Sequence, residues 1–311
     1  MANERMVRTA ALVALLAAAI SAGAVTARAG TVIDRKLALA PGGQFELYAF
    51  GGSVSVMGSA ESGVDVAISS SRDDVQRDVD FEFEENPGDV KVQAKPRNPW
   101  DFFFSGFGPS WLHYDIRVPK NTTVIIATSG GGIEAFALDG DTSLHTSGGS
   151  IEAVQLTGYL RASTSGGGIH ANAIHGSTEL HTSGGGIEAD GIDGALRAFT
   201  SGGWIRINGV TGRVDAHTSG GSIQAVFTKG NSSGGSLTTS GGWIEAKIDP
   251  AANLDIDAST SGGFVDSNLP LRQTEDFGHW HSHHALRGQL GSGGAALQMH
   301  TSGGSIRLSA L

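Results

Sequence analysis

The side chains best suited to metal binding are concentrated in residues 279–284, whose sequence is HWHSHH. In an extended segment alternate side chains point to the same side, so His279, His281 and His283 would present three imidazoles together, with His284 beside them. Neutral imidazole binds Zn²⁺, Ni²⁺ and Cu²⁺, and short His-rich tracts are typical of metal binding. Two interpretations follow: a metal site, or a polar loop with adventitious affinity, since no scaffold that would fix the ligands is visible.

Residues 97–111 hold the densest group of aromatic side chains, which are Trp100, Phe102, Phe103, Phe104, Phe107 and Trp111. Interspersed Pro and Gly argue against a regular helix or strand in this segment. Because so many rings are costly to leave in water, two interpretations are open. The rings form a plug over the open end of a hydrophobic core, or they form an exposed platform that binds a glycan, a lipid or a protein.

Two further tryptophans, Trp204 and Trp243, each follow directly after a Gly-Gly pair, and Phe264 follows a third pair. On a strand, residues two apart lie on the same side. The spacing therefore places all three rings with the outward-facing polar residues, near one edge of the molecule. Such rings can stack on sugar rings, or they can shield a turn and pack on a neighbouring loop.

No combination of residues predicts a catalytic site. Residues 230–234 match the G-x-S-x-G pattern, but a nucleophile elbow needs a following helix, and none is expected there. The carboxylates are spread along the repeats, whereas β-helix enzymes that act on polysaccharides need acids or bases that converge in a groove. The chain has no Cys, which excludes disulfides and thiolate catalysis. We expect a non-enzymatic protein, with a glycan-active enzyme as an alternative.

The elements that position these residues come from a tandem repeat. The tetrad Thr-Ser-Gly-Gly starts at Thr128, recurs every 18 residues up to Thr218, and returns at Thr239, Thr260 and Thr301. Between tetrads, apolar and polar residues alternate as in strands, and Gly marks the turns. Each copy predicts at least two short strands, too few to bury their own apolar face, so the copies must stack about 4.8 Å apart.

The sequence therefore predicts an all-β fold, namely a parallel β-solenoid (β-helix or β-roll) with coils of about 18 residues. The number of faces stays open, because the wider spacing between Ala171 and Ile174 indicates a bulge or an extra corner. Residues 128–311 would form the array, with a His-rich insertion at 267–290. Residues 30–127 would form an N-terminal β cap with the aromatic insertion, since a solenoid must cover its open end. A first coil at 51–56 is expected within it, separated from the main array.

One outward position in each copy forms a ladder, which in sequence order is Glu134, Glu152, His170, Glu188, Arg206, Gln224, Glu245, Asp266 and Arg307. At strand spacing we expect Glu188 and Arg206 to pair. Stacked Ser and Thr hydroxyls are expected to hydrogen-bond along the stack. A second column, His145, His181 and His217, recurs only on every second copy, roughly 9.6 Å apart, which is too far for shared metal ligation.

Composition and the N-terminal residues predict an exported protein. Arg5 and Arg8 precede an apolar run over residues 10–20, and Ala27-Arg28-Ala29 is a cleavage site of the A-x-A type. Residues 1–29 therefore read as a signal peptide, and no transmembrane anchor is expected because the apolar run is too short. The net charge of −10 argues against binding to nucleic acid or to anionic membranes.

A family resemblance supports the same fold. The run Ile116-Arg117-Val118-Pro119-Lys120 precedes repeats of the form Ser-Gly-Gly-x-Ile-x-Ala. With this pattern the chain resembles the bacterial putative-adhesin family of β-strand repeat proteins, whose function is unknown. The resemblance covers about residues 45–311 and implies an exported β-solenoid. It supplies no catalytic residues, and it does not extend to the aromatic segment or to the His-rich run.

Together these patterns predict an exported cell-envelope or surface solenoid, periplasmic or secreted, that binds a protein or glycan partner or serves as a structural protein. Self-association through the ends of the solenoid is a further expectation. The alternative is a metal-binding protein that uses the His-rich insertion, with no other cofactor.

Overall fold

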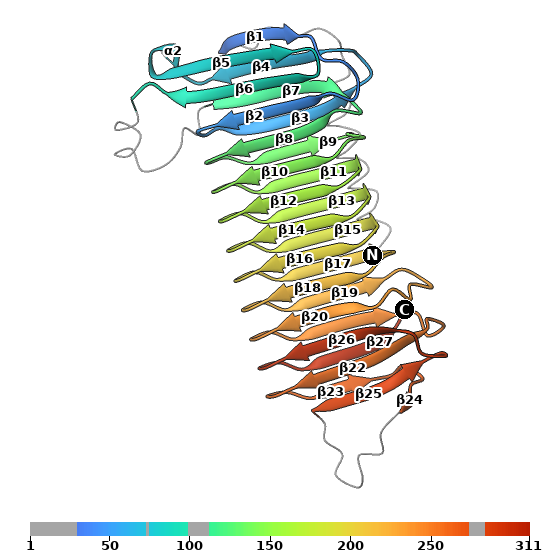
Figure 1. Cartoon of the computed structure of the whole chain (residues 1–311). Helices are drawn as coiled ribbons and strands as arrows, with labels where there is room; N and C mark the ends of the chain where they lie inside the picture. Colours follow the sequence, from blue (N-terminus) through green and yellow to red (C-terminus); the bar gives the residue numbers. More distant parts are fainter. Residues whose placement is uncertain (1–29, 73–74, 99–111, 274–283) are drawn as a thin grey trace.

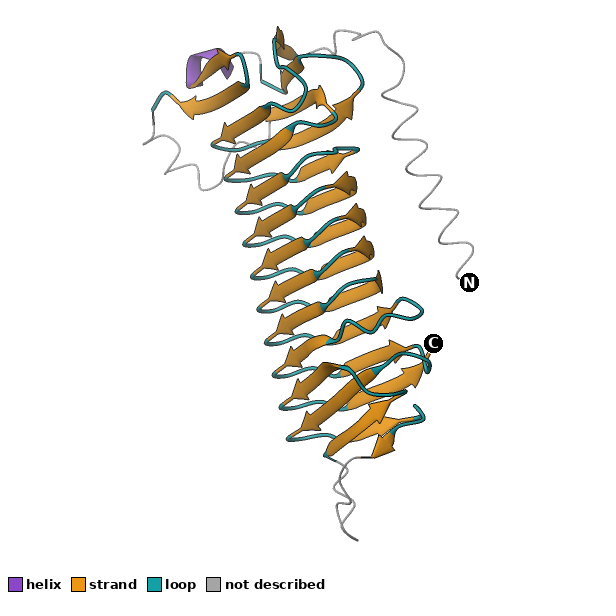
Figure 2. Cartoon of the chain, turned by 45° about the vertical axis from the view of Figure 1, so that its right-hand side comes forward, coloured by secondary structure: helices purple, strands orange, loops and turns teal. Residues whose placement is uncertain are grey.

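The computed structural model describes residues 30–72, 75–98, 112–273 and 284–311. These residues form one long column of stacked coils, in which strands of two sheets alternate along the chain (Figure 1). Each coil contributes one strand to each sheet, and the rotated view in Figure 2 shows the two sheets facing each other along the whole column. The prediction of an all-β parallel solenoid is confirmed, and the number of faces is two.

Among the described residues, the first sheet has 13 strands. Their bounds are β1 (Thr31–Leu37), β3 (Ser53–Ser59), β4 (Val64–Ser70), β7 (Leu112–Pro119), β9 (Ile133–Phe136), β11 (Ile151–Thr157), β13 (Ile169–His175), β15 (Ile187–Asp193), β17 (Ile205–Val210), β19 (Ile223–Phe227), β21 (Ile244–Ile248), β23 (Val265–Ser267) and β27 (Ile306–Ala310). In space they follow the order β1-β4-β7-β3-β9-β11-β13-β15-β17-β19-β21-β27-β23.

The second sheet has 14 strands in the part of the chain that the structure describes. Their bounds are β2 (Gln44–Ala49), β5 (Val79–Asn86), β6 (Asp89–Pro96), β8 (Thr123–Thr128), β10 (Thr142–Thr146), β12 (Leu160–Thr164), β14 (Thr178–Thr182), β16 (Leu196–Thr200), β18 (Val214–Thr218), β20 (Gly235–Thr239), β22 (Leu254–Thr260), β24 (Arg272–Gln273), β25 (Ala285–Leu290) and β26 (Ala295–Thr301). In space they follow the order β24-β25-β22-β26-β20-β18-β16-β14-β12-β10-β8-β2-β6-β5. A short helix, α2 (Val75–Asp78), precedes β5.

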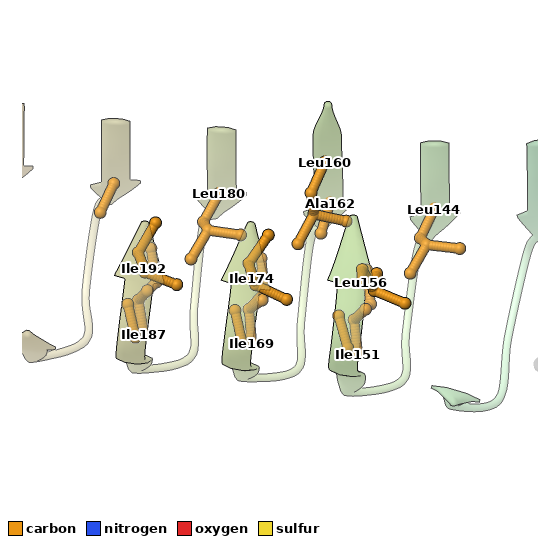
Figure 3. Close-up of a cluster of buried hydrophobic side chains, with 14 of the residues drawn as sticks. Leu144, Ile151, Leu156, Leu160, Ala162, Ile169, Ile174, Leu180, Ile187 and Ile192 are labelled. Carbon is orange, nitrogen blue, oxygen red and sulfur yellow. The ribbon is translucent and has the colours of Figure 1, made fainter. Parts of the chain in front are cut away.

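The coils of the array stack in register, so that equivalent residues of successive copies pair. Ile151 pairs with Ile169, and Ile169 with Ile187, in parallel strands. The interior of the column is filled by these isoleucines and by leucines from the facing sheet, such as Leu180, and all of them are buried (Figure 3). Complete burial of one such side chain contributes about 1.5–3 kcal/mol. The stack therefore supplies the apolar burial that a single coil lacks.

A left-handed kink, which we call the bulge, recurs at one position of five successive coils in the first sheet. Ala137, Gln155 and Ala173 have φ of 56°, 57° and 54°, and the equivalent residues of the next two coils are Gly191 and Gly209, with φ of 63° and 73°. Ala173, which lies between the buried residues Ala171 and Ile174, thus adopts the left-handed backbone conformation. The wider sequence spacing that indicated a bulge or an extra corner is explained by this bulge.

Replacing Ala173 by glycine is expected to raise the free energy of unfolding by about 0.5 kcal/mol. A left-handed conformation costs an L-residue about 1–2 kcal/mol, while glycine loses about 0.5–1 kcal/mol through backbone entropy. Urea unfolding of wild type and variant measures the difference. As the reciprocal control, Gly191→Ala should lose stability through φ alone, because an added Cβ would meet no atom closer than 3.8 Å. A loss of stability in Ala173→Gly would contradict the claim that the left-handed φ of Ala173 destabilises the fold.

The order of the coils in space differs from their order in the sequence at the C-terminal end. Strand β26 pairs with β20 on one side and β22 on the other, and β27 pairs likewise with β21 and β23. The last coil of the chain, residues 295–310, therefore lies between two coils that precede it in the sequence (Figure 1). We call this segment the inserted coil.

A similar exchange occurs at the N-terminal end. The coil of β2 and β3 lies between the coil of β6 and β7 and the coil of β8 and β9. The prediction that the coil at 51–56 is separate from the main array is therefore wrong: these residues join the array directly, with Val54 paired to Ile133.

Antiparallel strands lie outside the outermost parallel coils at both ends of the column. At the N-terminal end, β4 pairs with β7 and β1 pairs with β4, while β5 pairs with β6 across the turn between Asn86 and Asp89. At the C-terminal end, β25 pairs with β22 and β24 pairs with β25. These strands pair with the last parallel strands of both sheets at the N-terminal end and of the second sheet at the C-terminal end. The first sheet ends, within the described residues, with the parallel strand β23.

Within the described part of the chain, no helix combines the length and the apolar character needed to cross a membrane.

Candidate functional site

Each Thr-Ser-Gly-Gly tetrad forms the corner that joins a strand of the second sheet to a strand of the first. The threonine is buried and makes two hydrogen bonds. The Thr182 hydroxyl donates to the carbonyl of Gly167 in the preceding coil (2.7 Å), and it accepts from the backbone N–H of Gly185 (3.4 Å). Thr200 repeats both contacts. The threonine ladder thus bonds to backbone groups, ties adjacent coils together and closes each turn.

The second glycine of each tetrad is required by close approach of the coils. A Cβ added to Gly149 would lie 2.0 Å from the carbonyl oxygen of Gly131, whereas one added to Gly148 would meet no atom within 3.7 Å. The same short approach recurs along the column, for example between Gly185 and Gly167. Stacked glycine carbonyls therefore bring the corners into direct backbone contact, and the next residue is directed outward.

The residue that follows the glycine pair is aromatic in three coils near the C-terminal end. Trp204, Trp243 and Phe264 are 44%, 42% and 50% exposed. Strand register places Ser222 between the two tryptophans and Ser305 between Trp243 and Phe264. The rings therefore occupy alternate coils, roughly 9.6 Å apart along the column. We call these three residues the aromatic corner.

The predicted outward position of Trp204 and Trp243 is confirmed by their exposure, while their role in ligand binding stays a prediction. Trp204 also packs locally. Its indole covers the backbone of Gly186, where an added Cβ would lie 2.7 Å from the ring. The Arg206 guanidinium stacks over the same ring, 4.8 Å from its centre. Both proposed roles of these rings, shielding a turn and presenting a surface, are thus compatible with the geometry of Trp204.

The serines between the rings hold the aromatic residues in place. The backbone N–H of Trp243 donates to the Ser222 hydroxyl (3.2 Å), and the N–H of Phe264 donates to the Ser305 hydroxyl (3.3 Å). The backbone of Trp243 and of Phe264 is thus held by a hydrogen bond to the serine of the adjacent coil. Each ring residue directly precedes a strand of the first sheet, and its carbonyl accepts a hydrogen bond from a neighbouring coil, which holds the backbone of this surface in place.

A hollow of about 460 Å³ lies between Trp243 and Phe264. Its walls are formed by the two aromatic residues and by Gly241, Gly242, Ile244, Glu245, Gly304, Ser305 and Arg307. Ser305 and Arg307 belong to the inserted coil, which occupies the level between the two rings. The hollow therefore combines two apolar ring faces with an acid, a base, a hydroxyl and glycine backbone.

The polar ladder runs directly beside the aromatic corner. The predicted pair is confirmed, since Arg206 Nη1 lies 3.3 Å from Glu188 Oε1. Arg206 Nε also donates to Gln224 Oε1 (3.3 Å), and Gln224 Nε2 donates to Glu245 Oε2 (3.4 Å). In space Arg307 stands between Glu245 and Asp266, because the inserted coil changes the order that the sequence alone suggests.

A second outward column of the first sheet contains Asn172, Asp190 and Asn208 on adjacent coils. Burial raises the pKa of the Asp190 carboxyl above its ordinary value, and the nearby Glu188 carboxylate raises it further, while a hydrogen bond from Asn208 lowers it. The ionised form of Asp190 is thus less stable in the fold than in water.

Asp190→Asn is expected to stabilise the protein at pH 7. Because the pKa of Asp190 is higher in the folded than in the unfolded chain, stability falls as pH rises from the ordinary carboxyl value through the folded value. The amide removes this loss and continues the asparagine ladder. The gain should be on the order of 0.5 kcal/mol, the size of a cross-strand pair. Thermal unfolding should show the gain at pH 7 and none at about pH 3, below the ordinary pKa; an equal gain at both values would refute the electrostatic origin.

The other sequence candidates for ligand binding fall outside the described residues. Trp100, Phe102, Phe103, Phe104, Phe107 and Trp111 belong to the segment that joins β6 to β7, a connection that Thr-Ser-Gly-Gly makes in the array. Neither interpretation of these rings is tested. His279, His281 and His283 also lie outside the described residues, between β24 and β25. His284 is described; it is exposed, and its carbonyl accepts a hydrogen bond from the Thr260 N–H (2.8 Å).

Within the described ranges, no group of three or more His, Asp or Glu side chains is arranged to hold a metal ion. His145, His181 and His217 lie on alternate coils, as the sequence predicts. Ser163 lies between His145 and His181, and Phe199 lies between His181 and His217. His145 Nδ1 contacts the Ser163 hydroxyl at 2.8 Å. The metal site predicted at residues 279–284 stays a prediction.

A larger hollow, of about 900 Å³, lies at the N-terminal end of the column, lined by residues 36–40, 62–63 and 85–87. Its acidic side chain, Glu85, already accepts a hydrogen bond from the Ala38 N–H (2.9 Å). This hollow has Lys36, Ser62 and Asn86 as further polar side chains, but no aromatic residue lines it.

Comparison with known proteins extends the resemblance found in the sequence. The model of the family described as Toastrack DUF4097 matches residues 46–309, and no curated protein matches the chain. Solved structures with similar chains include a putative lipid binding protein from Parabacteroides distasonis (14% identity, 90% of this chain and 97% of that chain, TM-score 0.49). A putative adhesin from Bacteroides fragilis matches at 11% identity, over 89% of this chain and 96% of that chain, with a TM-score of 0.43. At such low identity, the function of the present chain is argued from its own residues.

Proposed function

The chain belongs to the Toastrack DUF4097 family, and from its own surface we propose that it is an exported, non-enzymatic protein that binds a partner through the aromatic corner. The observation that carries this proposal is the set of three exposed rings, Trp204, Trp243 and Phe264, held on alternate coils of a rigid column. Exposed aromatic side chains that border a hollow are the residues that dominate binding energy at contact surfaces.

Rigid presentation supports binding over a purely structural role. Each residue of the aromatic corner accepts a hydrogen bond at its carbonyl from the N–H of an isoleucine in a neighbouring coil (2.9 Å in each case). Ser222 and Ser305 also fix the coils that carry Trp243 and Phe264. A preorganised surface loses little conformational entropy when it binds.

The absence of catalysis is proposed from the arrangement of the acids. Catalytic carboxylates act in pairs that face a bound substrate. Here Glu188 lies against Arg206, and Glu245 accepts a hydrogen bond from Gln224. Glu134 and Glu152 are adjacent, but both are exposed on the outer face of the sheet. These contacts favour a surface that holds a ligand over one that cleaves it.

Export is proposed from the N-terminal sequence. Arg5 and Arg8, the apolar run over residues 10–20 and the A-x-A site that ends at Ala29 have the order of a signal peptide. The proposed location is the periplasm, the cell surface or the medium. A protein fusion that reports on transport, with and without residues 1–29, tests this part separately.

The binding proposal is tested with a variant in which all three rings become serine, namely Trp204→Ser, Trp243→Ser and Phe264→Ser. Serine is the natural residue of the intervening coils, so the column should keep its fold. On a glycan array and on purified envelope fractions, wild type is expected to bind and the variant to lose at least about tenfold in affinity, since each stacked ring contributes about 0.5–1.5 kcal/mol.

The matched control replaces two tyrosines of similar exposure that lie away from the aromatic corner, Tyr48 (40%) and Tyr159 (41%). Tyr48→Ser with Tyr159→Ser should bind as wild type does. Full binding by the triple variant would remove the aromatic corner as the contact site. Release of cleaved sugar from a bound glycan would support the enzymatic alternative.

A further inference from the structure

The spacing of the aromatic corner is periodic, and this limits the shape of its partner. Trp204, Trp243 and Phe264 each stand two coils from the next, because Ser222 and Ser305 occupy the coils between them. The repeat is roughly 9.6 Å, twice the strand spacing. A ligand that meets all three rings alike must therefore be linear and must repeat at about the same length.

A β-1,4-linked chain of pyranose sugars has this property. Successive sugars in such a chain are turned over, so the same face recurs at every second sugar, a distance close to that of two coils. The faces of a pyranose carry C–H groups that pack on aromatic rings, while its edges carry hydroxyls. Rings on every second coil would therefore meet every second sugar, and each serine level would lie opposite the sugar between.

The polar ladder beside the rings indicates the charge of the ligand. Along the column it reads Glu188, Arg206, Gln224, Glu245, Arg307 and Asp266. Each arginine has an acid beside it and the neutral Gln224 lies between Arg206 and Glu245, while Arg206 already neutralises Glu188 at 3.3 Å. Such a row offers both donors and acceptors without a field of one sign. Hydroxyl groups, which donate and accept, complement this row better than a polyanion or a polycation does.

The hollow between Trp243 and Phe264 has a size suited to one segment of such a ligand. Its volume of about 460 Å³ lies within the range of about 300–1,000 Å³ typical of small-ligand sites. Glu245 and Arg307 stand at its side, and the hydroxyl of Ser305 lies at the level between the rings. One sugar can enter this space while its neighbours stack on the two rings.

We propose that the aromatic corner binds a neutral, β-1,4-linked polysaccharide lengthwise along the column, with alternate sugars stacked on Trp204, Trp243 and Phe264. This proposal rests on the proposed function, in which the aromatic corner is the contact surface. Glu245 and Arg307 then bind the hydroxyls of the sugar held between Trp243 and Phe264.

The test uses the full chain and cello-oligosaccharides as probes, measured by isothermal titration calorimetry. Affinity should rise from the disaccharide to the hexasaccharide by at least about tenfold, since longer chains reach more rings. Trp243→Ser should lower hexasaccharide affinity by about 2- to 13-fold, the effect of one aromatic contact, and should lower disaccharide affinity by no more than the same factor. Tyr159→Ser, with equal thermal stability, should bind as wild type does.

Three outcomes would overturn the proposal. Affinity that does not depend on chain length would exclude lengthwise binding. Tighter binding of hexagalacturonate or of hexalysine than of cellohexaose would show that the surface selects charge. Absence of cello-oligosaccharide binding, while the triple serine variant still loses binding to an array glycan or to envelope fractions, would reject the sugar class and leave the proposed function standing. If the triple variant keeps all binding, both proposals fail.

Discussion

Gly149→Ala is expected to destabilise the column by about 3 kcal/mol, at the upper end of the range for overpacking, whereas Gly148→Ala should cost less than about 1 kcal/mol. The two glycines are neighbours in one tetrad, and neither has a left-handed φ. The difference comes from space alone. A Cβ on Gly149 would lie 2.0 Å from the oxygen and 2.1 Å from the carbon of the Gly131 carbonyl, while the nearest atom to one on Gly148 is 3.8 Å away.

The atoms that the new methyl group meets at Gly149 are backbone atoms, which the ladders of both sheets hold in place. The strain can be relieved only by separating two coils, and this would lengthen the hydrogen bond from the Thr146 hydroxyl to the Gly131 carbonyl (2.8 Å). Denaturant unfolding followed by circular dichroism measures both variants under the same conditions. Equal loss of stability in the two variants would contradict the direct stacking of the second glycines.

Removal of the inserted coil is expected to change which strands are neighbours, and engineered disulfides can detect this change. The chain has no Cys, so introduced pairs report on strand neighbours without interference. In the full chain Thr238 pairs with His300, and His300 with Ser259. Thr238→Cys with His300→Cys should form a disulfide on oxidation, since adjacent strands bring Cα atoms within the range of about 4.4–6.8 Å. Thr238→Cys with Ser259→Cys should not, because one coil separates them.

When the chain ends at residue 294, the second pair is expected to become reactive. Strands β20 and β22 both lead into a Thr-Ser-Gly-Gly corner, so β22 can pair directly with β20 once the inserted coil is gone. Phe264 would then lie one coil from Trp243, and the hollow between them would close. Mass spectrometry of the oxidised proteins measures each disulfide. A disulfide between positions 238 and 259 in the full chain would contradict the inserted coil.

The architecture of the array could be predicted from sequence because the signals are local and repeated. The alternation around Ile169 and Ile187 fixed which side chains face the core, and the spacing between Ala171 and Ile174 indicated the bulge at Ala173. The bonding partner of each corner threonine could not be predicted. The Gly167 carbonyl lies 15 residues before Thr182, and the contact exists only once the coils have stacked.

The order of the last coils could not be predicted for a different reason. Thr239, Thr260 and Thr301 begin identical tetrads, so the local energy of stacking does not distinguish their order. In the structure β22 pairs with β26 on one side and antiparallel with β25 on the other, and no local pattern indicates either neighbour. Part of the candidate site was missed as a result. The outward position of Trp204 and Trp243 could be predicted from the alternation of residues along the strands. The contribution of Ser305 and Arg307 to the hollow could not, because it depends on where the inserted coil lies.

The central claim is that one edge of a rigid column is the binding surface. The most direct measurement is hydroxyl-radical footprinting of the protein alone and in complex with the glycan or envelope material that it retains. Trp204, Trp243 and Phe264 should become protected from oxidation on binding, while Tyr48 and Tyr159, exposed to a similar extent, should react at unchanged rates. Protection of the two tyrosines, with unchanged oxidation of the three rings, would contradict the account.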